Sequence, residues 1–313
     1  MLPFTIDREE KAMLLEENQG LLHSCLKESR YSLITPRNKT DAVNKSSEEH
    51  PDLIMGNLDC KKMDVFTVCV NLRSDFQFKH VPIIVTGGEK TMQALKTAFP
   101  GVVDDYLEAP FDQEELLLRV EGVMARTRSY LEANPLTRLP GNEAIRRQIV
   151  NRMLHGKSFS LSWLDIDHFK AFNDKYGWER GDQMLSMLAS AVRESIKSVS
   201  GNQHAFAGHV GGDDFVLISD SEINSMLCER IIECFDRRAL DHFDAIDRER
   251  GFIQVKDRDG IVKRFPLMKL SIGVVEVRPG KDCDVGKIFN LAVMMKKKAK
   301  AVRGSCFEIG RFV

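Results

Sequence analysis

The chain has 313 residues, of which 43% are apolar and 29% charged, and this composition is typical of a globular protein with room for two domains. Its formal net charge of -1 argues against a surface that binds nucleic acid. The seven scattered cysteines include no Cys-x-x-Cys pair, and no apolar run approaches the roughly 18 to 20 residues that cross a bilayer. We therefore expect a cytoplasmic protein that binds neither membrane nor nucleic acid.

The first part of the chain alternates strands and helices. "AMLLEE" (12–17), "PDLIMGNL" (51–58) and "VPIIVTG" (81–87) predict buried strands, and "MQALKTAF" (92–99) predicts one of the helices between them. Continuously apolar strands that alternate with helices are typical of a doubly wound parallel sheet. The pattern predicts an α/β domain over residues 1–125.

This region resembles the response-regulator receiver domains, in which an aspartate accepts phosphate beside Mg²⁺, and "DDYLEAPF" is similar to the family's last strand motif. The family's acidic pair, acceptor, hydroxyl and lysine correspond here to Glu16, Glu17, Asn57, Thr86 and Ala109. An amide is a poor nucleophile and brings no charge for a metal ion, so Asn57 cannot replace the acceptor. The resemblance therefore implies a phosphorylation-incompetent pseudo-receiver that contacts an unknown signalling partner.

A charged helix is expected over residues 112–133. An a/d pattern runs along it through Leu117, Val120, Met124, Thr127 and Leu131. The pattern fits either a helix docked on its own domain or a short parallel coiled coil, and two heptads are too few to hold a dimer alone. Pro135 then ends the helix before a second domain over residues 134–313.

The second half predicts an α+β sandwich with a mainly antiparallel sheet. "SFSLSWLDID" (158–167) is a strand that ends in carboxylates, and "HAFAGHV" and "DFVLIS" are strands joined by "GGDD". "MKLSIGVVEV" is a further strand, and a helix is expected through "IFNLAVMMKKKAKAV". Helices before and between these strands complete the pattern.

The "GGDD" turn carries the most informative carboxylates. Gly211 and Gly212 can supply the positive φ of a hairpin tip, and Asp213 and Asp214 leave that tip on opposite faces of the returning strand. Asp165 can lie beside one of them if its strand is the neighbour in the sheet. Carboxylates gathered at strand ends predict a site for a hard cation, such as Mg²⁺ that holds a phosphate.

The blocks "LSWLDIDHFKAFNDKYGWERGDQML", "GGDDF" and "LSIGV", in this order and spacing, resemble the GGDEF-domain diguanylate cyclases over roughly residues 134 to 310. The resemblance implies a fold similar to the palm of polymerases and to nucleotidyl cyclases. It also implies synthesis of c-di-GMP from two GTP molecules, one held by each half of a homodimer, with release of pyrophosphate.

Residue by residue, the resemblance implies two Mg²⁺ (or Mn²⁺) ions per GTP site. The metal ligands would be Asp165, the carbonyl of Ile166, Asp213 and Asp214, with Asp213, Asp214 and Lys170 in catalysis. The GTP contacts would come from Phe169, Lys170, Asn173, Asp182 and Lys300. Asp182 favours guanine, because a carboxylate accepts hydrogen bonds that guanine offers and adenine does not. Lys296 and Lys297 are expected on a solvated helix face.

Some positions depart from the family pattern. Asp214 stands where the family usually has glutamate, and a hydrogen bond between Asn134 and His209 could replace an ion pair. The product-inhibition motif R-x-x-D is replaced by Asn202, Gln203, His204 and Ala205, so no such site is expected. The alternative to an active cyclase is a non-catalytic GTP-binding or scaffold signalling protein with a degenerate GGDEF domain.

Overall fold

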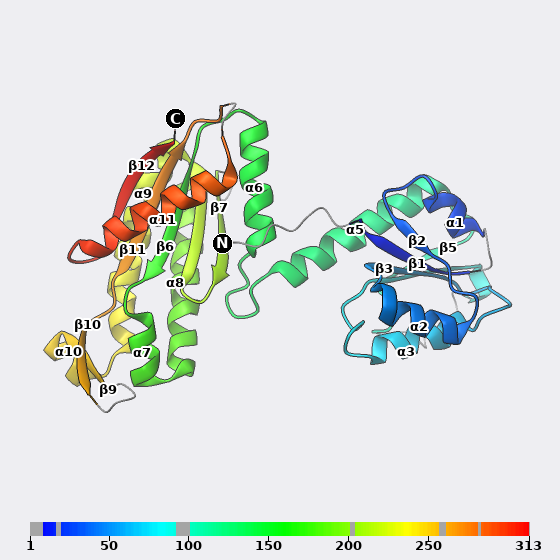
Figure 1. Ribbon diagram of the computed structural model, residues 1–313, viewed down its shortest axis with the longest axis horizontal. Helices are drawn as coiled ribbons and strands as arrows, with labels where there is room; N and C mark the ends of the chain where they lie inside the picture. Colours follow the sequence, from blue (N-terminus) through cyan, green and yellow to red (C-terminus); the bar gives the residue numbers. More distant parts are fainter. Residues whose placement is uncertain are drawn as a thin grey trace. The chain divides into compact units, whose positions relative to one another are not determined.

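The chain forms two compact units, residues 1–131 and 132–313, and each is described by itself (Figure 1). The computed structural model describes residues 9–16, 20–91, 101–200, 204–256, 261–280 and 283–312. The predicted helix at 92–99 and Glu17, Asn202 and Gln203 lie outside these ranges.

The first unit is built on a parallel sheet in the order β2-β1-β3-β4-β5. The strands are β1 (Lys11–Leu15), β2 (Ser32–Ile34), β3 (Leu53–Asn57), β4 (Ile83–Gly87) and β5 (Asp105–Glu108). The helices described here are α1 (Leu21–Leu26), α2 (Lys39–Glu49), α3 (Val65–Ser74) and α5 (Gln113–Glu132). Successive residues of β1 enter different apolar clusters on the two faces of the sheet. The predicted doubly wound α/β fold is confirmed.

Helix α5 packs on its own unit along most of the predicted seam. Val120 and Met124 are buried in the same cluster as Leu14, and Leu117 packs against that cluster. The coiled-coil interpretation is therefore wrong for these three positions, because their side chains are already covered. Leu131, the next-to-last residue of the helix, is 52% exposed.

The second unit is built on the sheet β12-β11-β6-β8-β7. Its strands are β6 (Phe159–Ile166), β7 (Ala205–Gly211), β8 (Asp214–Asp220), β11 (Leu270–Val277) and β12 (Cys306–Phe312), and β9 (Phe252–Lys256) pairs apart from them with β10 (Val262–Pro266). Within the five-stranded sheet the β11–β12 pair is parallel and the others are antiparallel, which confirms the predicted α+β class. All of β6 is buried, so its carboxyl end delivers Asp165 to a covered position.

Alternate residues of β6 pack against helices on opposite faces of the sheet. Phe159, Leu161 and Trp163 face the cluster that includes α6 (Asn142–Leu154) and α11 (Val285–Ala301). Leu164 and Ile166 face the opposite cluster, which contains residues of α7 (Phe169–Tyr176), α8 (Trp178–Ser200) and α9 (Ser221–Ala239). Since side chains alternate along a strand, Asp165 belongs to the α11 face.

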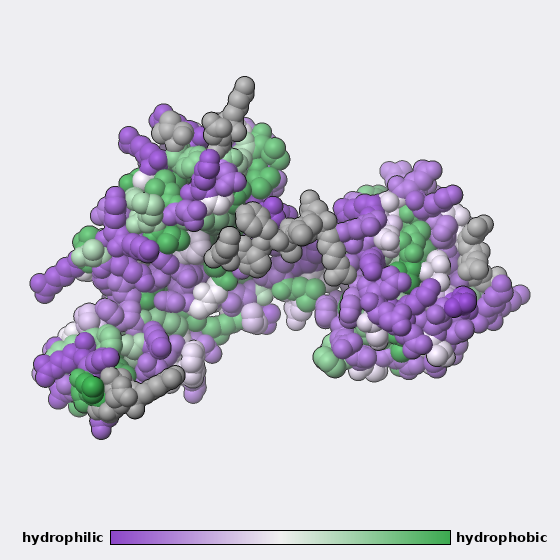
Figure 2. Space-filling view, viewed as in Figure 1, coloured by the Kyte–Doolittle hydropathy of each residue, from purple (hydrophilic) through white to green (hydrophobic). Residues whose placement is uncertain are grey.

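The surfaces visible in Figure 2 are mostly hydrophilic, with apolar side chains in scattered patches. No helix in the described ranges combines the length and the apolar character that a membrane crossing requires. The sequence patterns missed the helices α2, α3, α7 and α10 (Ala245–Arg250), each of which has 11 residues or fewer.

Gly273 of β11 allows α11 to approach the sheet closely. A Cβ atom at this position would lie 2.2 Å from the carbonyl oxygen of Ala292 and 2.3 Å from the backbone nitrogen of Lys296. Gly273 is also the cross-strand neighbour of Trp163. The absence of a side chain at Gly273 therefore allows the backbone of α11 to lie close to the sheet at Lys296.

Replacing Gly273 by alanine should destabilise the second unit. The added methyl group meets helix backbone, which cannot move aside as a side chain can, and we expect a loss of about 1–3 kcal/mol, or on the order of 5 °C in Tm. Thermal denaturation of Gly273→Ala measures the effect. Gly280→Ala is the control, because no atom lies within 4 Å of its added Cβ. Equal Tm values for the two variants would contradict the close-approach argument.

Candidate active site

The hairpin between β7 and β8 has a two-residue tip, Gly212 and Asp213. Gly211 pairs with Asp214 across it, and Gly212 takes the left-handed φ of 59°. The tip is thus one residue later than the predicted pair Gly211 and Gly212, because the strand β7 retains Gly211 as its last residue. Asp213 lies in the turn, and Asp214 is the first residue of β8.

The register of β6 and β8 brings two carboxylates together. Asp165 is the direct cross-strand partner of Asp214, so the expected proximity of Asp165 to the hairpin aspartates is confirmed. Their side chains share the face that α11 covers, since Trp163 and Val216, two residues along each strand, belong to the α11 cluster. On the other side of Asp165, its partner Ser271 has a buried hydroxyl with no hydrogen-bond partner among the described residues.

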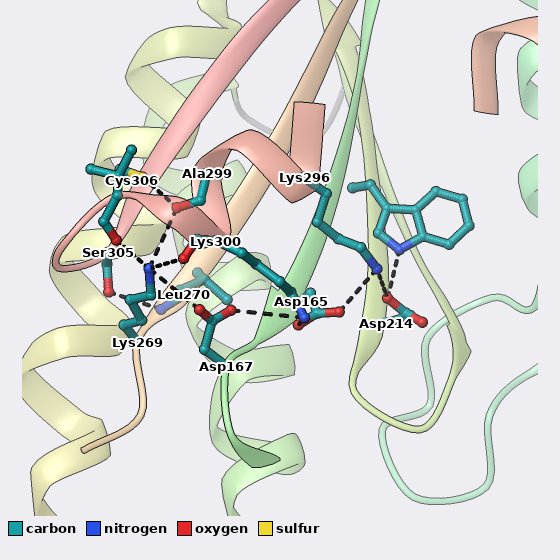
Figure 3. Close-up of polar contacts among 12 residues, drawn as sticks. Asp165, Asp167, Asp214, Lys269, Leu270, Lys296, Ala299, Lys300, Ser305 and Cys306 are labelled. Atoms are coloured by element: carbon teal, nitrogen blue, oxygen red, sulfur yellow. Dashed lines mark hydrogen bonds and ion pairs between the residues drawn. The ribbon is translucent and has the colours of Figure 1, made fainter. Parts of the chain in front are cut away.

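Lys296 of α11 lies between these two carboxylates (Figure 3). Its Nζ is 2.9 Å from Oδ2 of Asp165 and 2.6 Å from Oδ1 of Asp214, and its side chain is only 13% exposed. The prediction of a solvated helix face was wrong for Lys296, although Lys297 is exposed as expected. Lys296 and Lys300 are four residues apart, and this spacing puts both side chains on the same face of the helix, a signal that the prediction did not use.

Trp163 completes the contacts of Lys296 and Asp214. Its indole Nε1–H donates to Oδ1 of Asp214 at 2.7 Å, and its ring centroid lies 5.3 Å from the ammonium of Lys296. Burial alone would lower the pKa of Lys296, but the hydrogen bonds to Asp214 and Asp165 outweigh it and the net shift is upward. Lys296 is therefore a permanent cation of this site.

Two more lysines meet the end of β6. Lys300 Nζ is 2.5 Å from Oδ1 of Asp165 and 3.9 Å from Oδ1 of Asp167. Lys269 lies 3.3 Å from Oδ2 of Asp167 and donates to the carbonyls of Ala299 and Lys300 at the end of α11. A cation at a helix C-terminus is favourable, so Lys269 fixes the end of α11 beside the carboxylates.

The donor set fits a divalent cation on the side of Asp213. Burial and then the charge of Asp165 raise the pKa of Asp213 to about 6. Among the described residues Asp213 forms no salt bridge, whereas Asp165 contacts both Lys296 and Lys300. Among the described residues no three His, Cys, Asp or Glu side chains gather into a metal cage. Mg²⁺ needs no such cage, because it commonly binds one or two carboxylates together with substrate phosphates.

Two further predicted GTP contacts lie together on α7 and α8. Asn173 is buried, its Oδ1 has no hydrogen-bond partner among the described residues, and a Cβ at Gly181 would lie 2.0 Å from it. Asp182 follows Gly181 and is exposed. The geometry therefore presents an unpaired acceptor and an open carboxylate from adjoining helices.

The N-terminus of α7 follows directly after the strand β6. Phe169 is buried in the core and anchors the first turn, whereas Lys170 is exposed. His168 precedes them with a φ of 64° and makes no side-chain cap hydrogen bond. The first N–H groups of a helix have no partner within it, so this end can accept an anion.

His209 does not bond to Asn134 as we expected. Its Nδ1 is 3.0 Å from Oγ1 of Thr137, its Nε2 is 2.9 Å from the carbonyl oxygen of Gly212, and its ring stacks on Phe215. Asn134 instead accepts the N–H of Thr137. The link from Asn134 to the hairpin therefore runs through Thr137.

The receiver positions of the first unit make hydrogen bonds within their own domain. Glu16 accepts the backbone N–H groups of Leu22 at 3.0 Å and His23 at 2.6 Å. Burial raises the pKa of Glu16 in spite of these bonds. Its carboxylate thus binds the start of α1, and Glu17, its expected partner, lies outside the described residues.

The other receiver positions lie at the carboxyl ends of β3, β4 and β5. Asn57 Oδ1 accepts the N–H of Asp59 at 3.0 Å, Thr86 is buried and Ala109 is exposed. Asp59 in turn accepts from Thr91 Oγ1 at 2.6 Å and from the N–H of Gly88 at 2.7 Å. The Asn57–Asp59 bond lies within the turn after β3, and the contacts of Asp59 connect this turn to the residues that follow β4.

Comparison with known families agrees with this architecture. Residues 133–305 match the family model of the diguanylate cyclase GGDEF domain, and residues 16–121 match that of the response regulator receiver domain. The first match covers more than half of the chain. The protein belongs to the GGDEF domain family and carries a receiver domain before its GGDEF domain.

Individual relatives match parts of the chain. The diguanylate cyclase DgcS of Shewanella oneidensis is 35% identical over 103 residues, which are 32% of this chain and 33% of that protein. The transcriptional regulator RpaA of Synechocystis is 34% identical over 41% of this chain and 54% of its own length. The response regulator PleD of Caulobacter vibrioides is 27% identical over 53% of this chain and 39% of its own length. This chain therefore spans between about a third and about half of these relatives.

Among solved structures, the GGDEF domain of DgcB from Caulobacter crescentus in complex with c-di-GMP matches 57% of this chain and 95% of its own, at 22% identity and a TM-score of 0.41.

Asp213 should make the protein less stable at neutral pH in the absence of divalent cations. Its pKa rises from 3.8 to about 6 on folding, so its favourable contribution is complete below pH 4 and is lost as the pH rises through about 6. Asp213→Asn, measured in EDTA at pH 7.5, should raise Tm by about 2–4 °C, which corresponds to roughly 1 kcal/mol after allowance for solvent screening.

The Tm difference between Asp213→Asn and the natural chain should shrink toward pH 4. Asp174→Asn, on the exposed side of α7, serves as the control and should leave the pH profile of Tm unchanged. An Asp213→Asn variant that is equally or less stable at pH 7.5 would contradict the cost of keeping Asp213 ionised, which burial and then the charge of Asp165 produce.

Proposed function

We propose that this protein is a diguanylate cyclase that condenses two GTP molecules into c-di-GMP and releases two pyrophosphates, with one GTP on each chain of a homodimer. The observation that carries the proposal is the hairpin of a GGDEF domain, whose aspartates lie beside Asp165 under two lysines. Named relatives of the same family, DgcS among them, are diguanylate cyclases.

The triphosphate would lie at the start of α7. The backbone N–H groups of Phe169 and Lys170 are at an uncapped helix N-terminus, and the exposed Lys170 ammonium adds a counter-charge. Lys300, 40% exposed beside Asp165, can turn toward a phosphate when one arrives. Backbone and lysines together would neutralise the anion and hold it in place for transfer.

Guanine would be read by Asn173 and Asp182. The carboxylate of Asp182 can accept from the N1–H and exocyclic amine of guanine, and Asn173 offers an acceptor that is otherwise unpaired. Adenine has no donor at the first of these positions. An unpaired buried polar group costs about 1–3 kcal/mol, which is the size of discrimination we expect from this pair.

Asp165, Asp213 and the carbonyl of Ile166 would hold Mg²⁺ (or Mn²⁺) together with the phosphates. The ion would add positive charge beside Asp213, which forms no salt bridge among the described residues, and would stabilise the negative charge of the leaving pyrophosphate. Asp214 contributes differently. Trp163 and Lys296 both bind its Oδ1, which leaves Oδ2 to accept the proton of an attacking 3′-hydroxyl.

Regulation would not use phosphate on the receiver domain. The amide of Asn57 is turned back on Asp59 and offers no acyl acceptor, so the domain would act by contact with a signalling partner. Feedback through the R-x-x-D positions is also expected to be absent. At the described end of that segment, His204 is 2.7 Å from Asp220 and its carbonyl accepts from Arg152.

A non-catalytic GTP-binding protein is the second candidate. The observation that favours it is the salt bridge of Lys296, which neutralises a carboxylate that a metal ion would otherwise share. Such a protein would bind GTP and form no product.

Incubation of the full chain with GTP and Mg²⁺, followed by mass spectrometry, separates the two candidates. We expect c-di-GMP, a rate per chain that rises with protein concentration, and no change on adding acetyl phosphate. Asp213→Ala should lower the rate by about 100-fold or more, because the divalent ion loses a ligand, and Asp174→Asn should not. GTP binding without c-di-GMP at any protein concentration would favour the non-catalytic alternative.

A further inference from the structure

Lys296 has the environment of a bound cation. Its ammonium bridges Asp165 and Asp214, which come from adjacent strands (Figure 3). The indole ring of Trp163 lies beside it, with its centroid 5.3 Å from Nζ. A divalent ion bound by Oδ2 of Asp165 and Oδ1 of Asp214 would occupy the position that the ammonium takes. Asp214 Oδ1 is already bound twice, by Lys296 and by the indole N–H.

The packing of α11 on the sheet fixes the position of Lys296. The backbone of α11 at Lys296 lies close to Gly273 of β11, which is the cross-strand neighbour of Trp163. The short distance lets the four-carbon side chain of Lys296 end at the carboxylates with little freedom to leave. Burying an ammonium is unfavourable unless it is paired, and here two carboxylates pair with it.

Lys296 divides the three aspartates into two different environments. Asp214 forms a salt bridge with Lys296, whereas Asp213, in the turn directly before β8, forms none among the described residues. Asp165 lies opposite Asp214 in the neighbouring strand, and Asp213 is the next residue toward the tip of the hairpin. Lys300 contacts Asp165 from a side chain that is 40% exposed and free to turn to a phosphate. The positive charge still required lies on the Asp213 side alone.

We propose that Lys296 is a fixed cation that takes the place of one divalent ion, so that each GTP site binds a single divalent ion at Asp165 and Asp213. The inference deepens the proposed function and rests on it for the identity of the nucleotide. It replaces the two ions per site expected from the sequence by one ion and one ammonium.

The test counts Mn²⁺ ions per bound nucleotide. The full chain is saturated with Mn²⁺ and a GTP analogue whose α,β-bridging oxygen is a methylene, and protein-bound Mn²⁺ and nucleotide are measured after rapid gel filtration. The natural chain should carry one Mn²⁺ per analogue, and Lys296→Met should carry two, because Asp214 is released to share an ion with Asp165. Two ions on the natural chain, or one on Lys296→Met, would overturn the proposal.

Two variants serve as controls. Lys296→Arg keeps the positive charge and should remain at one Mn²⁺, and Lys297→Met removes a neighbouring exposed lysine and should also remain at one. Two ions on Lys296→Arg would show that the length of the side chain matters and not its charge, and would also overturn the proposal.

Mn²⁺ alone separates failure of this inference from failure of the proposed function. Without nucleotide, Lys296→Met should bind Mn²⁺ with a Kd about tenfold lower than the natural chain, since a like charge beside the carboxylates is gone. A chain that binds no GTP analogue but shows this change would contradict the proposed function and support the role of Lys296. An unchanged Kd would count against Lys296 whether or not the analogue binds.

Discussion

Carboxylates that face each other across two antiparallel strands repel, and the second unit depends on how that repulsion is offset. Asp165 and Asp214 are fixed opposite one another by the ladder between β6 and β8, so they cannot separate without breaking it. Lys296 lies between them because Gly273 lets α11 come close to the sheet. The absence of a side chain at Gly273 thus allows an ammonium group to lie between the two carboxylates.

The first unit differs at the corresponding edge of its own sheet. There Asn57 is neutral and accepts a hydrogen bond within its own turn, and Glu16 accepts two backbone N–H groups of α1. In the second unit the pKa of Asp213 is raised, and perturbed pKa values are common at functional sites.

The sequence predicted the strands well because a buried strand leaves a direct signature. The run from Phe159 to Ile166 is buried throughout, and its carboxyl end carries the aspartates that we singled out. Lys296 was missed because a lysine run on a helix is typical of a solvent-facing surface, although its spacing of one turn from Lys300 puts both lysines on one face. The close approach of α11 to the sheet at Gly273 then brings Lys296 to the carboxylates. The a/d pattern of α5 could not decide between two alternatives, since burial of Val120 and Met124 against their own unit gives the same spacing as a coiled coil.

The most direct measurement of the central claim is a crystal structure of the full chain with Mn²⁺ and the methylene GTP analogue, with anomalous scattering recorded at the manganese edge. The account predicts one anomalous peak per chain, bound by Asp165 and Asp213, with the ammonium of Lys296 still on Asp214. A peak between Asp165 and Asp214 with Lys296 displaced, or no peak beside Asp213, would contradict it.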